Sequence, residues 1–487
     1  MRLSALINHL EPVSIHGSLE AQIDNITCDT RKIRANSLFV AIKGYKLDGQ
    51  RYIPAALKQG AVCIVAERSD NLPQINNFCF VKVSDSRKAL ARLAAAFYRF
   101  PTDSLNLVGI TGTNGKTTTT HILASILKQA GHKTGLLGTI ANRIDNIVFA
   151  ATHTTPDSLE LQRYLRQMVE SGVTHVVLEV SSHGLTLNRM DGCTLKAAAF
   201  TNFTRDHLDF HNSMEDYLSA KKKIFDYVLP EGTVVLNHDD RVVYSLAKGL
   251  NLRAITCGLQ DGATVRALQI QNTREGLSFI IKAPGNSFII VRSALTGLHN
   301  VRNILMAASI ALGLRIDEEA ITSGVERVLN VPGRFEKIDL GRDILGIVDY
   351  AHTDDALCRL LTEARAITGS KLITVFGCGG DRDKGKRPLM GQAASELSDK
   401  VIITSDNPRN EEPMAIIQDI LKGIKKNNYH IIQDRGEAIF QAVKMAVPGD
   451  TVVIAGKGHE DYQEIGDNRI HFSDMEILHK AIESIGK

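Results

Sequence analysis

The strongest chemical signal in the sequence is the segment TGTNGKT at residues 111–117. In a turn between a strand and a helix, backbone N–H groups and the positive helix end face a phosphate chain, and Lys116 can bridge its oxygens. The strict pattern has glycine five residues before Gly115, where this chain has Ile110. An ordinary glycine-rich turn is the alternative, which Gly-Lys-Thr between a strand-like run and a helical pattern disfavours. The segment predicts ATP or GTP binding, with Thr117 placed to ligate Mg²⁺.

Two further side chains have the chemistry of metal ligands. Glu179 sits inside the apolar run 176–180, where an unpaired carboxylate would be costly and bound Mg²⁺ would relieve that cost. The alternative, an edge strand with the carboxylate in water, is disfavoured because the polar loop 181–184 follows at once. His207 follows an apolar run within the ligand-rich segment 201–211, and we interpret it as a ligand rather than a solvated loop residue. Both residues predict a metal site near the phosphate loop.

Three polar loops follow apolar runs in the last third of the chain, at residues 377–383, 405–409 and 456–460. Each could be a surface turn, but parallel strands deliver such loops into one crevice at their carboxyl ends. Arg409 offers a planar fork for a carboxylate, while carboxylates such as Asp406 suit an ammonium group. The loops therefore predict a site for a small molecule with an amine and a carboxylate at both ends.

Alternating strand-like and helix-like segments must position these residues. The 487 residues are too many for one core and indicate two to four domains of the α/β class. Strands are expected at 37–42, 61–65, 105–110, 176–180, 197–200, 344–348, 372–376, 401–404 and 451–455, with helices at 88–97 and from the phosphate loop to 130. Pro332-Gly333 is a plausible break. We expect domains at 1–100, 101–334 and 335–487, the second with a mostly parallel sheet.

Composition excludes several classes of function. The 57 basic and 54 acidic residues leave a formal charge of +3, so we expect no nucleic-acid partner, and the lysines at 221–223 are by default a solvated helix face. No apolar run is long enough for a membrane span and the first residues do not form a signal peptide, so a cytoplasmic location is expected. Seven scattered cysteines without a CxxC pair argue against a disulfide framework or zinc site.

Several motifs together resemble the Mur ligases of peptidoglycan synthesis. They are TGTNGKT at 111–117, EVSSH at 179–183, TNFTRDHLDFH at 201–211, YLSAKKKIF at 217–225, GLHNVRN at 297–303, PGRFE at 332–336 and DYAHT at 349–353. The resemblance implies three domains: an N-terminal UDP-binding domain, a central P-loop ATPase domain and a C-terminal Rossmann-like domain. Within the family the chain is similar to the ligases that add the third amino acid of the peptide.

The resemblance also implies roles for individual residues. Lys116, Lys221 and His207 would be catalytic, and two Mg²⁺ ions would be held by Thr117, Glu179, His207 and Lys221, the last as a carbamylated lysine. The implied ATP contacts are Gly112, Thr113, Asn114, Gly115, Lys116, Thr117, Thr118, Asn300, Asn303, Arg334 and Asp349. Those for the UDP-sugar peptide are Cys28, Thr30, Tyr45, Lys46, Leu47, Thr154, Thr155, Ser181, Leu187 and Arg189. Those for diaminopimelate are Arg382, Asp406, Asn407, Pro408, Arg409, Gly456 and Glu460.

The implied activity is ATP-dependent addition of meso-diaminopimelate to UDP-N-acetylmuramoyl-L-alanyl-D-glutamate through an acyl phosphate, by a monomer. Two positions depart from the pattern: Leu187 stands where glutamine is frequent, and Asp354 where proline is usual. The alternatives are the lysine-adding ligase of the family, a ligase resembling folylpolyglutamate synthase, and a P-loop ATPase without ligase activity. Arg409 argues against the first, because lysine has no distal carboxylate. The uridine-type first domain argues against the second, and the three crevice loops against the third.

Overall fold

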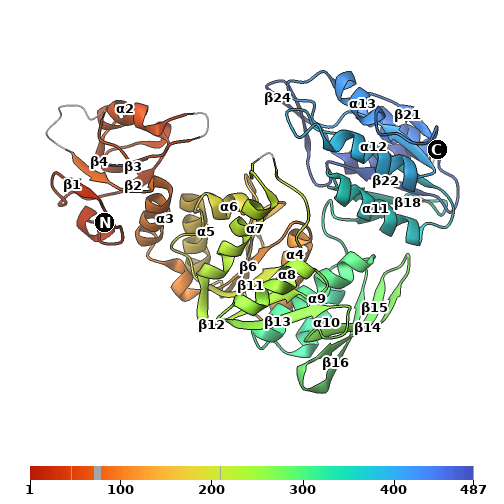
Figure 1. Ribbon diagram of the computed structural model, residues 1–487, viewed down its shortest axis with the longest axis horizontal. Coiled ribbons are helices and arrows are strands. Elements are labelled where there is room, and N and C mark those ends of the chain that lie inside the picture. The colour runs from red at the N-terminus through yellow and green to blue at the C-terminus, as the bar shows by residue number, and fades with distance from the viewer. Residues whose placement is uncertain (45–46, 71–77, 209, 486–487) are drawn as a thin grey trace.

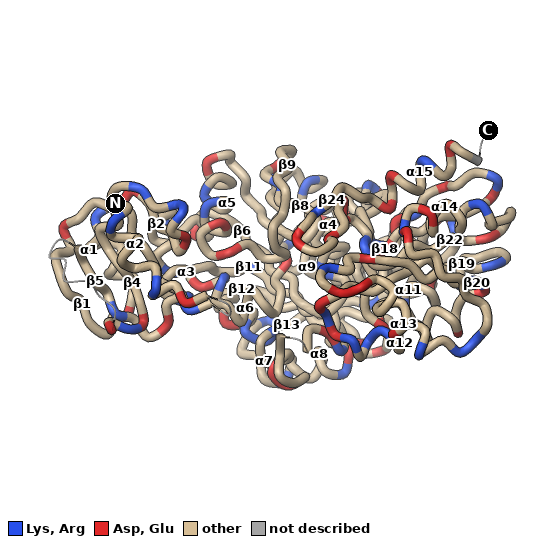
Figure 2. The backbone as a smooth tube through the Cα atoms, turned by 90° about the horizontal axis from the view of Figure 1, so that it is seen from above, with Lys and Arg blue, Asp and Glu red and all other residues tan. Residues whose placement is uncertain are grey.

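The computed structural model describes residues 1–44, 47–70, 78–208 and 210–485. Three α/β domains follow one another along the molecule, with the central one between the other two (Figure 1). Basic and acidic residues are interspersed over all three domains (Figure 2), in keeping with the small formal charge of +3. None of the helices in the described ranges combines the length and apolar character that a membrane crossing requires.

The N-terminal domain is built on a five-stranded sheet of order β1-β5-β4-β3-β2. Its strands are β1 (Ser14–His16), β2 (Asn25–Thr27), β3 (Ser37–Ala41), β4 (Ala61–Ala66) and β5 (Cys79–Lys82), and its helices are α1 (Leu3–Ile7), α2 (Ile53–Lys58) and α3 (Ser86–Phe97). Asp85 caps α3 by accepting hydrogen bonds from two backbone N–H groups. The strands and helix expected in this region are confirmed within a residue or two.

The central domain contains an eleven-stranded sheet of order β16-β15-β14-β13-β12-β11-β6-β10-β7-β8-β9. The strands are β6 (Asn106–Thr111), β7 (Thr134–Leu137), β8 (Ala141–Ile144), β9 (Ile147–Ala150), β10 (His175–Glu179), β11 (Leu195–Phe200), β12 (Val228–Asn237), β13 (Arg253–Gly258), β14 (Val265–Asn272), β15 (Leu277–Ala283) and β16 (Ser287–Ser293). Strands β7, β10, β6, β11, β12, β13 and β14 run parallel, which confirms the mostly parallel sheet. Antiparallel hairpins extend both ends.

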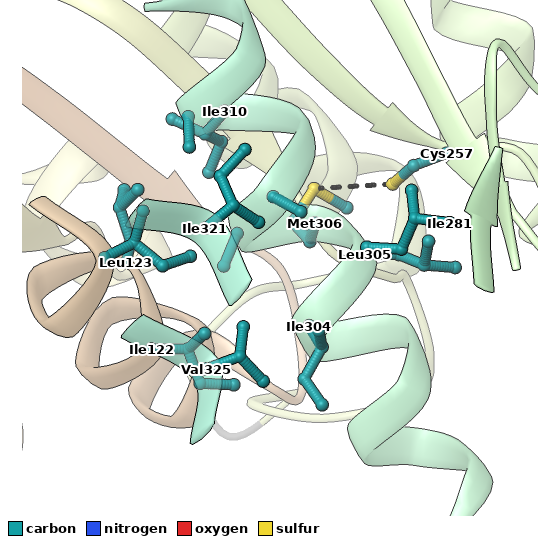
Figure 3. Packing of buried hydrophobic residues seen from close by; sticks show 14 of the residues in the cluster. Ile122, Leu123, Cys257, Ile281, Ile304, Leu305, Met306, Ile310, Ile321 and Val325 are labelled. Atoms are coloured by element: carbon teal, nitrogen blue, oxygen red, sulfur yellow. Dashed lines mark hydrogen bonds between the residues drawn. The ribbon is translucent and has the colours of Figure 1, made fainter. Parts of the chain in front are cut away.

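Helices cover both faces of this sheet. They are α4 (Lys116–Gln129), α5 (Ser158–Glu170), α6 (Ser182–Thr186), α7 (Met214–Lys222), α8 (Arg241–Ser245), α9 (Leu298–Gly313) and α10 (Glu318–Glu326). On one face, buried side chains of α4, α9 and α10 form a single core with the strands, including Leu123, Ile310 and Ile321 (Figure 3). This packing fixes the first turn of α4, and with it the phosphate loop.

The C-terminal domain has a six-stranded sheet of order β17-β18-β22-β19-β20-β21. Its strands are β17 (Glu336–Asp339), β18 (Leu345–Asp349), β19 (Leu372–Phe376), β20 (Lys400–Ile403), β21 (Tyr429–Ile431) and β22 (Thr451–Ala455); its helices are α11 (Asp354–Ile367), α12 (Lys386–Leu397), α13 (Pro413–Leu421), α14 (Arg435–Met445) and α15 (Asp474–Ile485). All pairings are parallel except that of β17. A separate hairpin, β23 (Tyr462–Ile465) and β24 (Asn468–His471), was not expected from the sequence.

Candidate active site

The phosphate loop lies between β6 and α4, as predicted. Strand β6 is sandwiched between the parallel strands β10 and β11, so the loop emerges at the centre of the sheet. Gly112 has φ +140° and Gly115 has φ +83°, values that side chains rarely adopt. A Cβ at Gly112 would collide with the Thr201 hydroxyl, and one at Gly115 with the Asn303 amide. These two positions therefore require glycine, which keeps backbone N–H groups open to a phosphate.

Lys116 is folded back onto its own loop. Its Nζ donates hydrogen bonds to the carbonyl oxygens of Gly112, at 2.9 Å, and Thr113, at 2.8 Å. Burial lowers the pKa of Lys116, although the nearby carboxylates of Glu179 and Asp206 act to raise it. A phosphate chain would offer this ammonium stronger partners than two neutral carbonyl groups.

Glu179 is the last residue of β10 and is fully buried. Its carboxylate accepts hydrogen bonds from the Thr117 hydroxyl at 2.9 Å and from both the N–H (2.9 Å) and hydroxyl (3.0 Å) of Thr139. Because β10 pairs with β6 on one side and β7 on the other, the edge-strand alternative is wrong. Hydroxyl and carboxylate oxygens side by side are the hard donors that Mg²⁺ prefers, so the residues fit that ion, with phosphate oxygens and water to complete its shell.

His207 lies beyond the end of β11, in a left-handed conformation with φ +53°. Its ring centre is 4.9 Å from that of His183, and its Nε2 is 3.6 Å from the Asp206 carboxylate. Burial lowers the pKa of His207 to about 4 despite Asp206, with further contributions from the charges of Lys116 and Lys221. The imidazole is therefore neutral at pH 7, the state in which histidine can ligate a metal.

Lys221 on α7 is 1% exposed, so the interpretation of this lysine as part of a solvated face is wrong. That interpretation holds for its neighbours Lys222 and Lys223, which are exposed. The Nζ of Lys221 donates a 2.7 Å hydrogen bond to the Gly112 carbonyl and lies 4.6 Å from the centre of the Tyr217 ring. Burial and the nearby Lys116 charge hold the pKa of Lys221 well below its usual range. Helical periodicity explains the difference, because only one of three consecutive positions faces the core.

A cavity of about 150 Å³ lies between the central and C-terminal domains. Its lining includes Asn114, Gly115, Thr118, Asn303, Arg334 and Asp349, all predicted for ATP. Asn300 does not line it: its side chain accepts a 3.1 Å hydrogen bond from Asn303 and so supports that residue from behind. The apolar part of the lining includes Cys257 and Met306, whose sulfur atoms are 3.9 Å apart (Figure 3). An apolar cavity wall next to a phosphate loop suits the flat, largely apolar base of a nucleotide.

Several residues of this cavity were missed in the sequence. Arg302 and His299 line it from α9, and Arg359 from α11. The motif at 297–303 contains the first two; the His299 ring lies 3.9 Å from the Glu363 carboxylate of the C-terminal domain, whereas Arg302 pairs with Asp239 of the central domain. Arg334, in the connection between the domains, reaches the P-loop, with its Nη2 donating to the Thr117 hydroxyl at 3.3 Å. The cavity and this contact therefore connect both domains to the same phosphate loop.

Part of the predicted sugar-peptide site comes together in the central domain. The Thr155 hydroxyl lies 3.1 Å from the Ser181 hydroxyl, and Arg189 Nη1 donates to the Thr155 carbonyl at 2.5 Å. Thr154 accepts a 3.1 Å hydrogen bond from Thr139, which also contacts Glu179. Leu187 is half-buried at the end of α6. These polar groups therefore form a surface that adjoins Glu179, one of the candidate metal ligands.

The remaining residues of that prediction lie on the N-terminal domain. Cys28 and Thr30 follow β2, and Leu47 is 65% exposed. Tyr45 and Lys46 lie outside the described residues. The described structure contains no hydrogen bond from these side chains to the central domain. The residues predicted for the sugar peptide therefore lie in two groups, one on each domain.

The three C-terminal loops meet at the carboxyl ends of β19, β20 and β22, as expected. Asn407 donates a 3.0 Å hydrogen bond to Glu460, and a Cβ at Gly456 would come within 2.5 Å of the Asp406 carboxylate. Pro408 lies in the same turn, with its carbonyl oxygen close against Gly380. Arg382 is exposed and hydrogen-bonds only its neighbour's carbonyl within the described structure. The loops therefore bring most, but not all, of the predicted residues together.

Two charged residues of this crevice were missed. Lys457 is fully buried, and its Nζ donates to Glu460 at 3.0 Å and to Asn407 at 3.1 Å. Arg435 is also fully buried and lies 4.0 Å from the Asp406 carboxylate. Nothing in the local sequence distinguishes these cations from the many exposed ones, because their burial depends on neighbouring loops.

A phosphate loop, a buried carboxylate against its threonine, and a cavity beside that loop closed by a second α/β domain define a P-loop enzyme that acts at a domain junction. Three family models match the chain: the Mur ligase family catalytic domain over residues 22–98, the Mur ligase middle domain over 110–311 and the Mur ligase glutamate ligase domain over 333–458. The chain therefore belongs to the Mur ligase family.

Two relatives and one solved structure show how far the similarity extends. A UDP-N-acetylmuramoyl-L-alanyl-D-glutamate--2,6-diaminopimelate ligase of Clostridium tetani is 42% identical, with all of both chains covered. The protein of the same name from Bacillus licheniformis is 44% identical, with 99% of each chain covered. A solved structure under that name is 32% identical over 100% of both chains, with a TM-score of 0.71. The similarity thus includes all three domains.

Proposed function

We propose that this chain is the ligase that joins meso-diaminopimelate to UDP-N-acetylmuramoyl-L-alanyl-D-glutamate, with conversion of ATP to ADP and phosphate. The observation that carries the proposal is the end-to-end match, at 42–44% identity, to relatives named for this reaction. The geometry supports it, because a phosphate loop, a polar surface leading from Glu179 and a charged crevice supply separate places for three substrates.

The proposed chemistry has two steps. A D-glutamyl carboxylate oxygen attacks the γ-phosphorus of ATP, and the bond from that phosphorus to ADP breaks. The amine of diaminopimelate then attacks the acyl carbon, the carbon–oxygen bond to phosphate breaks, and the amine loses a proton. Lys116 would leave the carbonyl groups of Gly112 and Thr113 and neutralise charge on the transferring phosphoryl group. No bond between protein and substrate forms.

Mg²⁺ would be held by Thr117 and Glu179, whose side-chain oxygens are already 2.9 Å apart, with His207 at a second position. When bound, the ion supplies charge neutralisation for the phosphates. We further propose that Lys221 is carbamylated. It is almost fully buried beside the Gly112 carbonyl, and no ion pair reaches it within the described structure. Its low pKa favours the neutral amine that adds carbon dioxide, and the carbamate would supply an anionic ligand.

We propose the following division of the chain: residues 1–100 bind the uridine end, 101–334 bind ATP and the peptide, and 335–487 bind the amino acid. Arg334 and Asp349 line the proposed nucleotide cavity at the junction of the two domains. Their position there supports closure of the third domain onto the second during the reaction. The monomeric state and the cytoplasmic location stay predictions.

The second candidate is the lysine-adding ligase of the family. It would use the same ATP site, so Arg409 is the observation that discriminates, because a lysine side chain brings no carboxylate to pair with it. A folylpolyglutamate synthase or a switch ATPase would not account for the full-length match to the named relatives.

The test is phosphate release by the purified protein with ATP, Mg²⁺ and the UDP-linked dipeptide. Diaminopimelate, L-lysine and no amino acid are supplied in parallel reactions. The proposal expects sustained release with diaminopimelate, at least about tenfold slower release with lysine, and a product whose mass equals the dipeptide plus one diaminopimelate minus water. Release that does not depend on an amino acid would indicate an ATPase, and preference for lysine would support the second candidate.

A further inference from the structure

Strand β23 fastens the loop 405–409 of the amino-acid crevice. Gln463 donates a 2.6 Å hydrogen bond to the Asp406 carbonyl, and the Glu464 N–H donates to the Asn407 side chain at 3.0 Å. The Arg409 N–H donates to the Glu464 carbonyl at 3.0 Å, and the Gly466 N–H donates to the Arg409 carbonyl at 2.8 Å. The hairpin therefore holds this loop at Asp406, Asn407 and Arg409, although it belongs to no other sheet.

The side chain of Glu464 also contacts the guanidinium of Arg409. Arg409 Nε donates to the Glu464 carboxylate at 2.9 Å, and Arg409 Nη1 donates to the Gly380 carbonyl at 2.8 Å. Within the described ranges, no hydrogen bond joins Nη2 to another group of the protein. The Arg409 side chain is 22% exposed and that of Glu464 is 30% exposed, so a ligand can still reach the pair.

We propose that Glu464 is a positioning residue for Arg409 and thereby contributes to amino-acid specificity. This inference rests on the proposed function. Glu464 and Gly380 hold two nitrogens of the guanidinium, which leaves Nη2 and the second N–H of Nη1 for the distal carboxylate of diaminopimelate. A long side chain fixed before binding loses less conformational entropy when the ligand arrives.

The contact geometry favours positioning over competition. A carboxylate that merely occupied the ligand's place would form the two parallel hydrogen bonds typical of an arginine–carboxylate pair. Glu464 forms one, at Nε, and the Gly380 carbonyl fixes the opposite side. Arg409 has φ +51°; its N–H is bonded to Glu464 in β23 and its carbonyl to Gly466 in the turn that follows, so the same hairpin also holds its backbone. We therefore expect the position of the Arg409 guanidinium to depend on a hydrogen-bond acceptor at residue 464, and not on the charge of that acceptor.

This distinction sets the choice of variants. Glu464→Ala removes the acceptor at Nε and frees the guanidinium. Glu464→Gln keeps an acceptor oxygen at the same distance from the backbone but removes the charge that opposes a second carboxylate. Asp467→Ala, in the exposed turn of the same hairpin, is the matched control for general disturbance of β23 and β24.

The experiment measures phosphate release by the full chain as a function of diaminopimelate and, separately, L-lysine concentration. We expect Glu464→Ala to raise KM for diaminopimelate by about tenfold or more, with kcat within about threefold and lysine use unchanged. Glu464→Gln and Asp467→Ala should stay within about threefold of the wild type for diaminopimelate. In an Arg409→Ala background, Glu464→Ala should add no further loss, because the two residues act through one contact.

The following outcomes would overturn the inference. A lower KM for diaminopimelate in both Glu464 variants would make Glu464 a competitor of the ligand. Equal losses for diaminopimelate and lysine, or an additional loss in the Arg409→Ala background, would reduce Glu464 to general support of the fold. A wild-type KM in Glu464→Ala would remove its role. A wild-type protein that neither turns over nor binds diaminopimelate in calorimetry would refute the proposed function itself and this inference with it.

Discussion

Replacing Asp474 by asparagine tests a fully buried ion pair of the C-terminal domain. Asp474 and Arg435 both have fully buried side chains, and two hydrogen bonds of 2.7 Å join them. Burial by itself would lower the pKa of Arg435, but the carboxylates of Asp474, Asp406 and Glu460, with Asp474 contributing most, together raise it above its usual value. Arg435 also donates to the Ala455 carbonyl at 3.0 Å, at the end of β22. The pair thus supports the floor of the amino-acid crevice.

The magnitude follows from the lost counter-ion. Asp474→Asn keeps a similar shape but leaves the buried guanidinium without its bidentate partner, which costs about 3 to 5 kcal/mol. For a domain of about 150 residues, each 1 kcal/mol lowers Tm by about 2 to 4 °C. We therefore expect the transition of the C-terminal domain to fall by about 6 to 20 °C, with the other domains unaffected. Asp406, 4.0 Å from Arg435, is too distant to replace the missing carboxylate.

The assay is differential scanning calorimetry of the full chain, combined with hydrogen exchange to assign the shifted transition to α14 and α15. The double variant Arg435→Met with Asp474→Leu is the control, because removing both charges leaves none uncompensated and should recover most of the stability. A loss below about 1 kcal/mol in Asp474→Asn, or a double variant no better than the single one, would refute this reasoning.

The remaining predictions concern the proposed reaction. Lys116→Ala should lower ATP-dependent turnover by about a hundredfold or more, because the charge on the transferring phosphoryl group loses its ammonium; near-normal turnover would contradict the phosphate-loop assignment. Lys221→Ala should be severely impaired and partly rescued by added acetate, since the carbamate is proposed to act as an anion, whereas full activity without acetate would exclude that role. Arg409→Ala should cost about 2 to 5 kcal/mol, or about 30- to 5000-fold in kcat/KM, for diaminopimelate but little for lysine; equal fractional losses would assign Arg409 to the fold instead.

The sequence was most informative where local chemistry and local structure coincide. The phosphate loop could be predicted because the strand before it, its glycines and the helix after it are consecutive in the chain. The burial of Glu179 near the phosphate loop could be predicted from a carboxylate inside the apolar run 176–180, and the structure places it at the last residue of β10, against Thr117. Such features depend on few residues, so periodicity and residue type suffice.

Features that depend on distant segments were not predictable in this way. The hairpins at both ends of the central sheet contain short apolar runs that also occur in parallel strands and buried helices. The burial of Lys221 depends on which face of α7 meets the phosphate loop, and Lys457 is in contact with Asn407 in the loop after β20. Arg302 and Arg359 became cavity residues only when two domains were placed together. The burial and contacts of these residues depend on how distant segments pack together, and not on residue type.

The bonds from β23 to the loop 405–409 can form only late in synthesis of the chain, because β23 lies near its C-terminal end. The ribosome delivers β6 and α4 long before residues 462–466, so the phosphate loop can fold while the amino-acid crevice still lacks the strand that fastens Asn407 and Arg409. In a nascent chain the phosphate loop can therefore form before the amino-acid crevice is complete. The amino-acid crevice is therefore completed only near the end of synthesis, when β23 and then Asp474 of α15 have been made.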